Sequence, residues 1–198
     1  IDAADPGPTV ADWPSPARGT AGASTPYGNC DGSWTTACAF RYGVQRASYL
    51  TRIASLIREN ADQLARLVVQ EQGKPLYEAR GEIGGTAEFF DYFATFARAA
   101  TGEIMAADAP NEDIWIRKVP YGVVVGIIPW NYPAALFARK VAPALMAGNT
   151  IVIKPHEDTP LSALALAKLV EEAGVPAGVV NVVTGAGAEV GDALVRDD

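Results

Sequence analysis

The chain has little cysteine and almost no histidine. Its 198 residues contain two cysteines, Cys30 and Cys38, and one histidine, His156. The cysteines lack the C-x-x-C spacing of redox and metal motifs and have no histidine beside them, and His156 has no second ligand nearby, so we expect no metal site. Because a reducing cytoplasm disfavours a disulfide, we interpret both cysteines as inert thiols.

The sequence also lacks a long apolar run and an excess of positive charge. No stretch approaches the roughly 18 uncharged apolar residues of a membrane span, and residues 1–6 have neither the basic nor the apolar region of a secretion signal. With 16 Lys and Arg against 23 Asp and Glu, the net charge of −7 repels polyphosphate. We therefore expect a cytoplasmic protein with no nucleic-acid partner and no membrane partner.

What the chain does contain is enough apolar sequence for a folded core. Hydrophobic residues make up 49% and charged residues 20%, a composition that excludes a disordered tail or a collagen-like fibre. Residues 1–44 are rich in Pro, Gly, Ser, Thr and Ala and hold no helical or strand period, so we treat them as an unpatterned segment. Residues 45–198 show the periodicity of a domain.

Helical patterns come first in this domain. Apolar residues recur at helical spacing over residues 44–72, and Gly73-Lys74-Pro75 follows as a stop signal. Phenylalanines spaced i, i+4 and i+7 from Phe89 predict a second helix to about Ala100, with the aromatic rings as a packing stripe. Two short apolar segments around a polar turn then predict a β-hairpin at 103–119, which we assign to oligomerisation.

After Pro120, strands and helices alternate. Residues 122–128 are apolar on both faces, which predicts a central parallel strand covered by helices on both sides. A helix at 134–147, a strand at 150–153, a helix opened by Thr159-Pro160 and a strand at 179–183 follow. This spacing predicts an α/β fold: a partial doubly wound parallel sheet of Rossmann-like type, with N-terminal helices and a β-hairpin arm.

In such sheets, ligands bind at the carboxyl ends of the strands. Asn131 lies between two prolines just past the first strand, where a fixed amide can donate to an oxyanion or merely satisfy backbone groups of the turn. Lys154 and Glu157 follow the second strand and suit the hydroxyls of a ribose, or form a solvated loop with two charges. The G-x-G-x-x-x-G run from Gly185 suits a nucleotide or a tight turn.

Taken in order, these segments resemble the aldehyde dehydrogenase superfamily from about Val44 to the C-terminus. The helical stretch from Arg46 and the segment Phe89–Phe93 are most similar to the bacterial lactaldehyde, glycolaldehyde and succinate-semialdehyde group. The segments that carry the resemblance are Val119–Val124, Pro129–Pro133, Lys140–Leu145, Gly148–Thr150, Ile153–Pro155 and Gly174–Val183.

The resemblance implies an oxidoreductase that oxidises a small aldehyde to a carboxylate with NAD(P). In the family, a cysteine thiolate attacks the aldehyde, hydride passes to the nicotinamide, and a glutamate activates the hydrolytic water. By matching position, Asn131 corresponds to the amide that stabilises the oxyanion, and Lys140 to a lysine assigned to a proton relay.

The resemblance also implies that residues 45–198 form an incomplete NAD-binding domain of the aldehyde dehydrogenase type, and it assigns the cofactor site. Ile128, Pro129 and Trp130 would line the nicotinamide side. Lys154 and Glu157 would bind the adenine ribose, with Gly187 close to the adenine. Glu157 favours NAD, but His156 stands where the family often has a small residue such as serine, so NADP is not excluded.

The departures from the family lead to three hypotheses. No residues match the family's catalytic glutamate and cysteine, because Cys30 and Cys38 lie in the non-matching segment 1–44. We interpret that segment as disordered or frame-shifted. We therefore expect an aldehyde dehydrogenase that is inactive as this truncated chain, full-length members of the family being homo-oligomers. The alternatives are a non-catalytic module that binds nucleotide or a longer homologue, and an acyl-phosphate or acyl-CoA reductase of similar fold.

Overall fold

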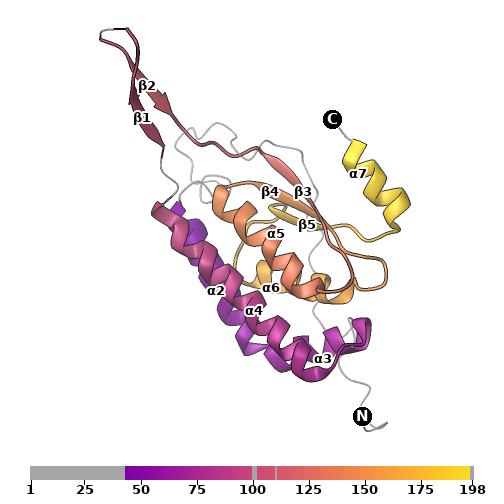
Figure 1. Ribbon diagram of the computed structural model, residues 1–198. Coiled ribbons are helices and arrows are strands. Elements are labelled where there is room, and N and C mark those ends of the chain that lie inside the picture. Colours follow the sequence, from indigo (N-terminus) through magenta and orange to yellow (C-terminus); the bar gives the residue numbers. More distant parts are fainter. Residues whose placement is uncertain (1–42, 100–101, 110, 197–198) are drawn as a thin grey trace, which may run out of the picture.

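The computed structural model describes residues 43–99, 102–109 and 111–196. The predictions for Cys30, Cys38 and nearly all of the segment 1–44 lie outside these residues. In the described part, an N-terminal group of helices is followed by a projecting hairpin and then by a parallel sheet with its own helices (Figure 1).

Three helices form the N-terminal group: α2 (Gly43–Glu59), α3 (Ala61–Gln72) and α4 (Leu76–Ala94). The sequence predicted one helix up to residue 72, but the chain breaks at Asn60, whose side-chain amide donates to the Leu56 carbonyl 2.9 Å away. The expected stop is confirmed, because Gly73 ends α3 in the left-handed region with φ of 84°.

The core lies where these helices meet the sheet. Helix α4 packs against both α2 and α5 (Pro133–Ala147), as Figure 1 shows. Phe89, Phe93 and Phe96 pack against this core as the aromatic stripe predicts, and the fully buried ring of α4 is Phe90. Helix α4 ends at Ala94, and a 3-10 turn, η2 (Thr95–Arg98), completes the predicted segment.

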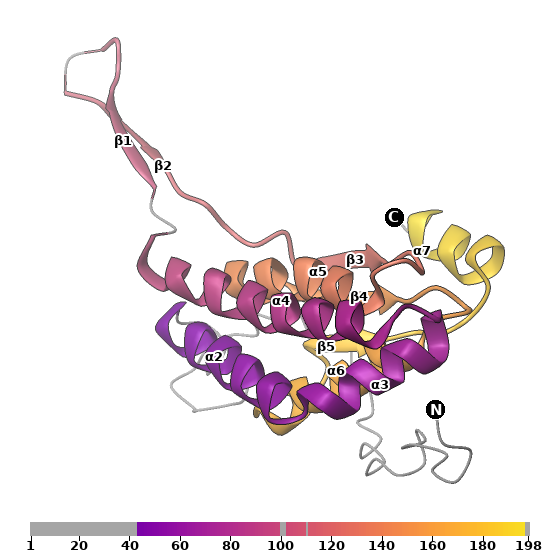
Figure 2. The same cartoon turned by 60° about the horizontal axis from the view of Figure 1, so that its bottom comes forward.

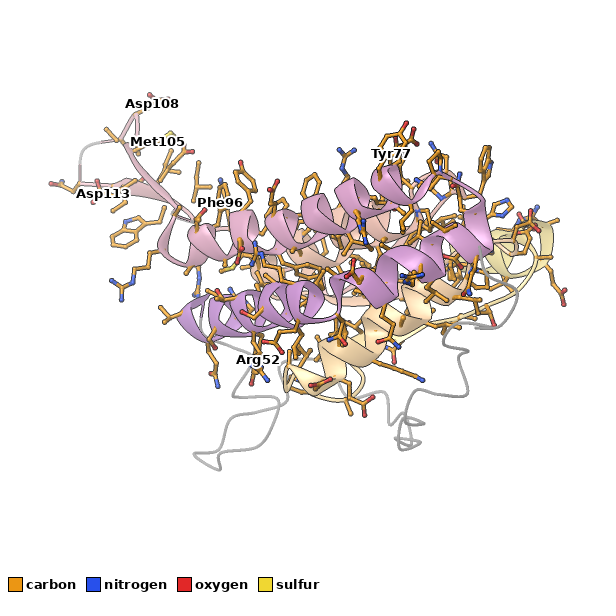
Figure 3. All side chains as sticks on the ribbon, turned by 90° about the horizontal axis from the view of Figure 1, so that it is seen from below. Arg52, Tyr77, Phe96, Met105, Asp108 and Asp113 are labelled. Carbon is orange, nitrogen blue, oxygen red and sulfur yellow. The ribbon has the colours of Figure 1, made fainter. Side chains whose placement is uncertain are left out.

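The predicted hairpin is present as an arm that projects from the body of the molecule. Strands β1 (Glu103–Ala106) and β2 (Asp113–Ile116) pair antiparallel, with Ile104 opposite Trp115. Figure 3 shows Met105, Asp108 and Asp113 at the far end of the arm, away from the helices. Every residue of both strands is exposed, and the Trp115 side chain is 74% exposed. Its use in oligomerisation stays a prediction.

The sheet confirms the α/β class. Strands β3 (Val123–Ile127), β4 (Thr150–Lys154) and β5 (Val180–Val182) are parallel in the order β3-β4-β5. Helices α5 and α6 (Leu161–Glu172) make the two crossovers. A π-helical turn, η3 (Gly187–Gly191), leads into α7 (Asp192–Arg196), which lies beside the carboxyl end of β3 (Figure 2).

The position of β3 differs from the prediction of a central strand covered on both faces. Among the described residues, β3 is an edge strand, and one of its faces carries the exposed side chains of Val123, Val125 and Ile127. Val123 is 67% exposed. An apolar run identifies a strand but does not identify its neighbours, and among the described residues β3 has one neighbour, β4.

Candidate functional site

The carboxyl ends of the three strands meet at one edge of the sheet. The ladder continues past β3 and β5, because the Ile128 N–H donates to the Lys154 carbonyl at 3.0 Å and the Val183 N–H donates to the Ile153 carbonyl at 2.9 Å. The turns that follow the strands therefore leave the sheet side by side. They carry nearly all of the side chains that the sequence singled out.

The turn after β3 presents Asn131 outward. Trp130, Asn131 and Tyr132 are exposed, while Ile128 beneath them is buried. Pro133 then opens α5 at the first helical position, where its missing N–H costs nothing. The Asn131 amide is thus accessible to a ligand, and a helix N-terminus with its partial positive charge lies directly behind it.

Two buried charged residues that the sequence analysis missed support this turn. Glu82 of α4 accepts hydrogen bonds at Oε1 from the N–H groups of Ala134 and Ala135, at 2.9 and 3.1 Å. Lys74 Nζ lies 2.6 Å from Glu82 Oε2 and donates to the Asn131 carbonyl at 3.0 Å. A charged residue on the buried stripe of α4, next to Ile83, is the signal that could have revealed Glu82.

The second turn brings Lys154, Glu157 and Gly187 together, as the sequence predicts. Lys154 Nζ is buried, donates to the Pro155 carbonyl at 2.8 Å and lies 3.5 Å from Glu157 Oε2. Gly187 lies so close that a Cβ on it would be 3.9 Å from Glu157 Oε2. Backbone N–H groups, first that of Glu157 itself and then that of Gly187, lower the pKa of the Glu157 carboxyl, which is ionised at neutral pH.

A shallow hollow adjoins this group. It has a volume of about 470 Å³ and is lined by residues from the end of β3, from η3 and from α7. The lining residues are Ile127, Gly187, Ala188, Gly191, Asp192 and Val195. Most of this lining is apolar, and Glu157 and Lys154 lie at its border, beside Gly187 and Gly191. Such a surface suits a flat ring attached to a hydroxylated sugar.

The remaining predicted residues lie in the turns after β3 and β4 and on α5. Pro129 is exposed in the turn after β3. His156 is partly buried in the turn after β4, and its Nδ1 accepts from the Asp158 N–H at 3.2 Å. Lys140 is on the exposed side of α5, seven residues past Pro133, or about 10 Å along the helix axis.

The described residues 43–99, 102–109 and 111–196 contain no cluster of three or more His, Cys, Asp or Glu side chains that could hold a metal ion. Across the same ranges, no helix has the length and apolar character needed to cross a bilayer.

The start of α6 corrects a local prediction. The sequence predicts Thr159 as the cap and Pro160 as the first helical residue, but α6 begins at Leu161. The cap is Glu71 of α3, whose carboxylate accepts from the N–H groups of Leu161 at 2.7 Å and Ser162 at 3.1 Å. A carboxylate suits a helix N-terminus, because it accepts from free N–H groups and complements the helix dipole.

Glu71 makes the stability of the chain depend on pH. Burial raises the pKa of its carboxyl, against the lowering effect of the hydrogen bonds from Ser162 and Leu161. The folded state therefore holds this proton more tightly than the unfolded state, so stability from Glu71 is fully present below the unfolded pKa and is lost as pH rises through the folded pKa. In urea unfolding between about pH 4 and about pH 7, the wild type should gain stability relative to Glu71→Gln as pH falls. A constant difference between the two proteins would contradict this assignment.

Comparison with known proteins gives a consistent result. A family model described as "Aldehyde dehydrogenase family" matches residues 40–198. The chain is 53% identical over 155 residues to a 3,6-anhydro-alpha-L-galactose dehydrogenase of Streptomyces coelicolor, covering 78% of this chain and 31% of that protein. It is 50% identical over 151 residues to the lactaldehyde dehydrogenase of Escherichia coli, covering 76% of this chain and 32% of that protein. The chain thus spans about a third of the length of the curated relatives it matches.

Solved structures agree with the sequence comparisons. A 3,6-anhydro-L-galactose dehydrogenase in complex with NAP superposes with a TM-score of 0.77 at 50% identity, over 79% of this chain and 33% of that one. The betaine aldehyde dehydrogenase of Staphylococcus aureus, in complex with NAD+, superposes with a TM-score of 0.76 at 38% identity, over 79% of this chain and 32% of that one.

Proposed function

Because the chain belongs to the aldehyde dehydrogenase family, we propose that it forms the coenzyme-binding part of an enzyme that oxidises a small aldehyde to a carboxylate with NAD(P). The observation that carries the proposal is the convergence of an accessible amide, Asn131, with the Lys154, Glu157 and Gly187 group at one edge of a parallel sheet. Ligands of doubly wound sheets bind at such an edge.

On the adenosine side, the charged pair is the binding group. Lys154 would donate to a ribose hydroxyl and Glu157 would accept from one, and the hollow beside Gly187 would hold the adenine. The residues fit this role, because Gly187 has no Cβ to fill the space beside the Glu157 carboxylate. An ionised Glu157 repels a 2′-phosphate, which favours NAD over NADP. A relative from Thermoplasma acidophilum, 44% identical, is named D-glyceraldehyde dehydrogenase (NADP(+)), so both cofactors belong in the assay.

On the reaction side, the chain supplies orientation and charge. The nicotinamide, when bound, accepts the hydride. Ile128, Pro129 and Trp130 would line its ring, and the Asn131 amide would donate to the aldehyde oxygen as negative charge develops there. Lys140 is assigned to a proton relay toward solvent. Residues 40–198, which match the family, contain no cysteine, because Cys30 and Cys38 both precede them, so we place the thiol nucleophile outside this region. By the family resemblance, we place the glutamate base there as well.

The test is coenzyme binding and turnover. We expect the chain to bind NAD in calorimetry but to reduce none with lactaldehyde, glycolaldehyde or succinate semialdehyde. A longer product of the same gene that contains residues 1–198 should form NADH with one of these aldehydes. Failure of the folded chain to bind either NAD or NADP would overturn the coenzyme site, and turnover by the 198 residues alone would overturn the placement of the nucleophile.

One observation supports a second function. The apolar side chains exposed on the hairpin arm are suited to pairing with another chain. The partner would be a second copy in a homo-oligomer, or a longer homologue if the chain is a non-catalytic module. The non-catalytic module would be favoured if the chain copurified with a longer homologue and no product of its own gene turned over aldehyde. Reduction of an acyl phosphate or acyl-CoA would instead favour the reductase.

A further inference from the structure

A buried ion pair joins the N-terminal helices to the turn that carries Asn131. Lys74 stands in the short connection between α3 and α4, directly after the left-handed Gly73, and Glu82 lies in the second turn of α4. The Lys74 and Glu82 side chains are 6% and 0% exposed, and their charged atoms are 2.6 Å apart. Water therefore screens this pair very little.

Among the described residues, the other side-chain hydrogen bonds of the pair and its cation–π contact go to one short segment, residues 131–135. Glu82 uses its second oxygen for two backbone N–H groups of α5. Lys74 donates to the Asn131 carbonyl, and its ammonium lies 4.0 Å from the centre of the Tyr132 ring. The pair thus holds both sides of the point where the turn becomes a helix.

Stability alone does not account for this arrangement. Desolvation of a buried ion pair offsets much of its attraction, and apolar residues of similar size often stabilise a protein equally well. An ion pair differs from apolar residues in its directional hydrogen bonds, which fix donors and acceptors in one geometry. Here, those directional bonds end on the Asn131 carbonyl and on the N-terminus of α5.

We propose that Lys74 and Glu82 are positioning residues that fix the backbone of the Asn131 turn and so set where the Asn131 amide points. With its carbonyl held inward by Lys74, the peptide that follows Asn131 cannot rotate, and the side chain stays on the exposed side of the turn. The inference deepens the proposed function and rests on it for its kinetic consequence. The effect on the backbone is independent of any reaction.

The test is a double substitution that leaves no buried charge unpaired. Lys74→Met with Glu82→Gln removes the bond to the Asn131 carbonyl, while the glutamine oxygen remains as an acceptor for the N–H groups of α5. The matched control is Arg80→Met with Asp62→Asn, which removes an ion pair of 3.0 Å that is exposed and also joins α4 to its neighbour. If the double variant does not fold, Lys74→Leu with Glu82→Gln serves, because it also leaves no buried charge unpaired and fills the site of Lys74 with a differently shaped apolar side chain.

The first readout is hydrogen exchange in the full chain, followed by mass spectrometry. The amides of residues 132 and 134–136 should exchange about tenfold faster in the double variant and at the wild-type rate in the control, with the rest of α5 unchanged. Unchanged exchange at these amides would overturn the proposal. This readout needs no activity, so it decides the positioning role even where the wild type turns over no aldehyde and the proposed function fails.

The second readout is steady-state kinetics, measured on whichever form of the protein turns over aldehyde. It separates a positioning role from a general loss of structure. The rate constant kcat, counted per NAD-binding site, should fall about 10 to 100-fold in the double variant, since a misplaced group loses rate of this order. The KM for NAD should stay within about threefold, and the control should keep both values. Where Asn131→Ala itself lowers kcat, a kcat of the double variant within threefold of the wild type, or a loss explained by fewer binding sites, would overturn the proposal.

Discussion

Replacing Glu82 with alanine is expected to lower the free energy of unfolding by about 3–5 kcal/mol, the cost of breaking a buried ion pair by removing one partner. The substitution leaves the Lys74 ammonium buried without its counter-charge. It also removes the acceptor for the N–H groups of Ala134 and Ala135, at a helix start that has no side-chain cap of its own. Both losses lie at the junction of α4 and α5, two helices that contribute buried residues to the hydrophobic core.

Urea unfolding at pH 7 measures this loss, and Asp62→Ala is the control. Asp62 also pairs with a cation of α4, but its side chain is 77% exposed, so its removal should change the free energy of unfolding by less than about 1 kcal/mol. The double variant Lys74→Met with Glu82→Gln should lose less than Glu82→Ala, because it strands no charge. A loss below about 1 kcal/mol for Glu82→Ala would show that the pair contributes little to stability.

The elements of the fold were predictable because their signals are local. Gly73 ended α3 as expected, since a left-handed residue after an apolar helix has few alternatives to glycine. The strands of the hairpin and of the sheet were also found where apolar runs predicted them. The break at Asn60 was missed because the helical period continues on both sides of it, and one side-chain hydrogen bond is too small a signal to stand out.

The family resemblance and the grouping of the site residues were predictable for a different reason. Parallel strands end at one edge, so residues just past Ile128 and Lys154 had to meet there, whatever the helices did. The caps of α5 and α6 were not predictable in this way. They come from Glu82 and Glu71, 52 and 90 residues earlier in the chain, and no local pattern records a contact at that separation.

Asn131→Ala should lower kcat by about 10² to 10³-fold in the form of the protein that turns over aldehyde, the loss typical of removing one oxyanion donor. Asn131 is exposed in the turn after β3, and its backbone carbonyl accepts the hydrogen bond from Lys74, so we expect the fold not to depend on its side chain. NAD binding should therefore persist, because its proposed ligands, Lys154 and Glu157, follow a different strand. Steady-state kinetics with NADH formation as the signal, beside calorimetry of NAD binding, measure both quantities.

Two further variants separate loss of a donor from loss of shape. Asn131→Asp keeps the size of the side chain but replaces the donor with an anion, so it should lose at least as much kcat as alanine. Asn181→Ala removes an exposed asparagine of β5 whose amide donates to the Gly178 carbonyl, and it should leave kcat within about twofold. Equal activity of Asn131→Ala and the wild type would remove the oxyanion role, and the Lys74 and Glu82 pair would then position a turn with no part in the reaction.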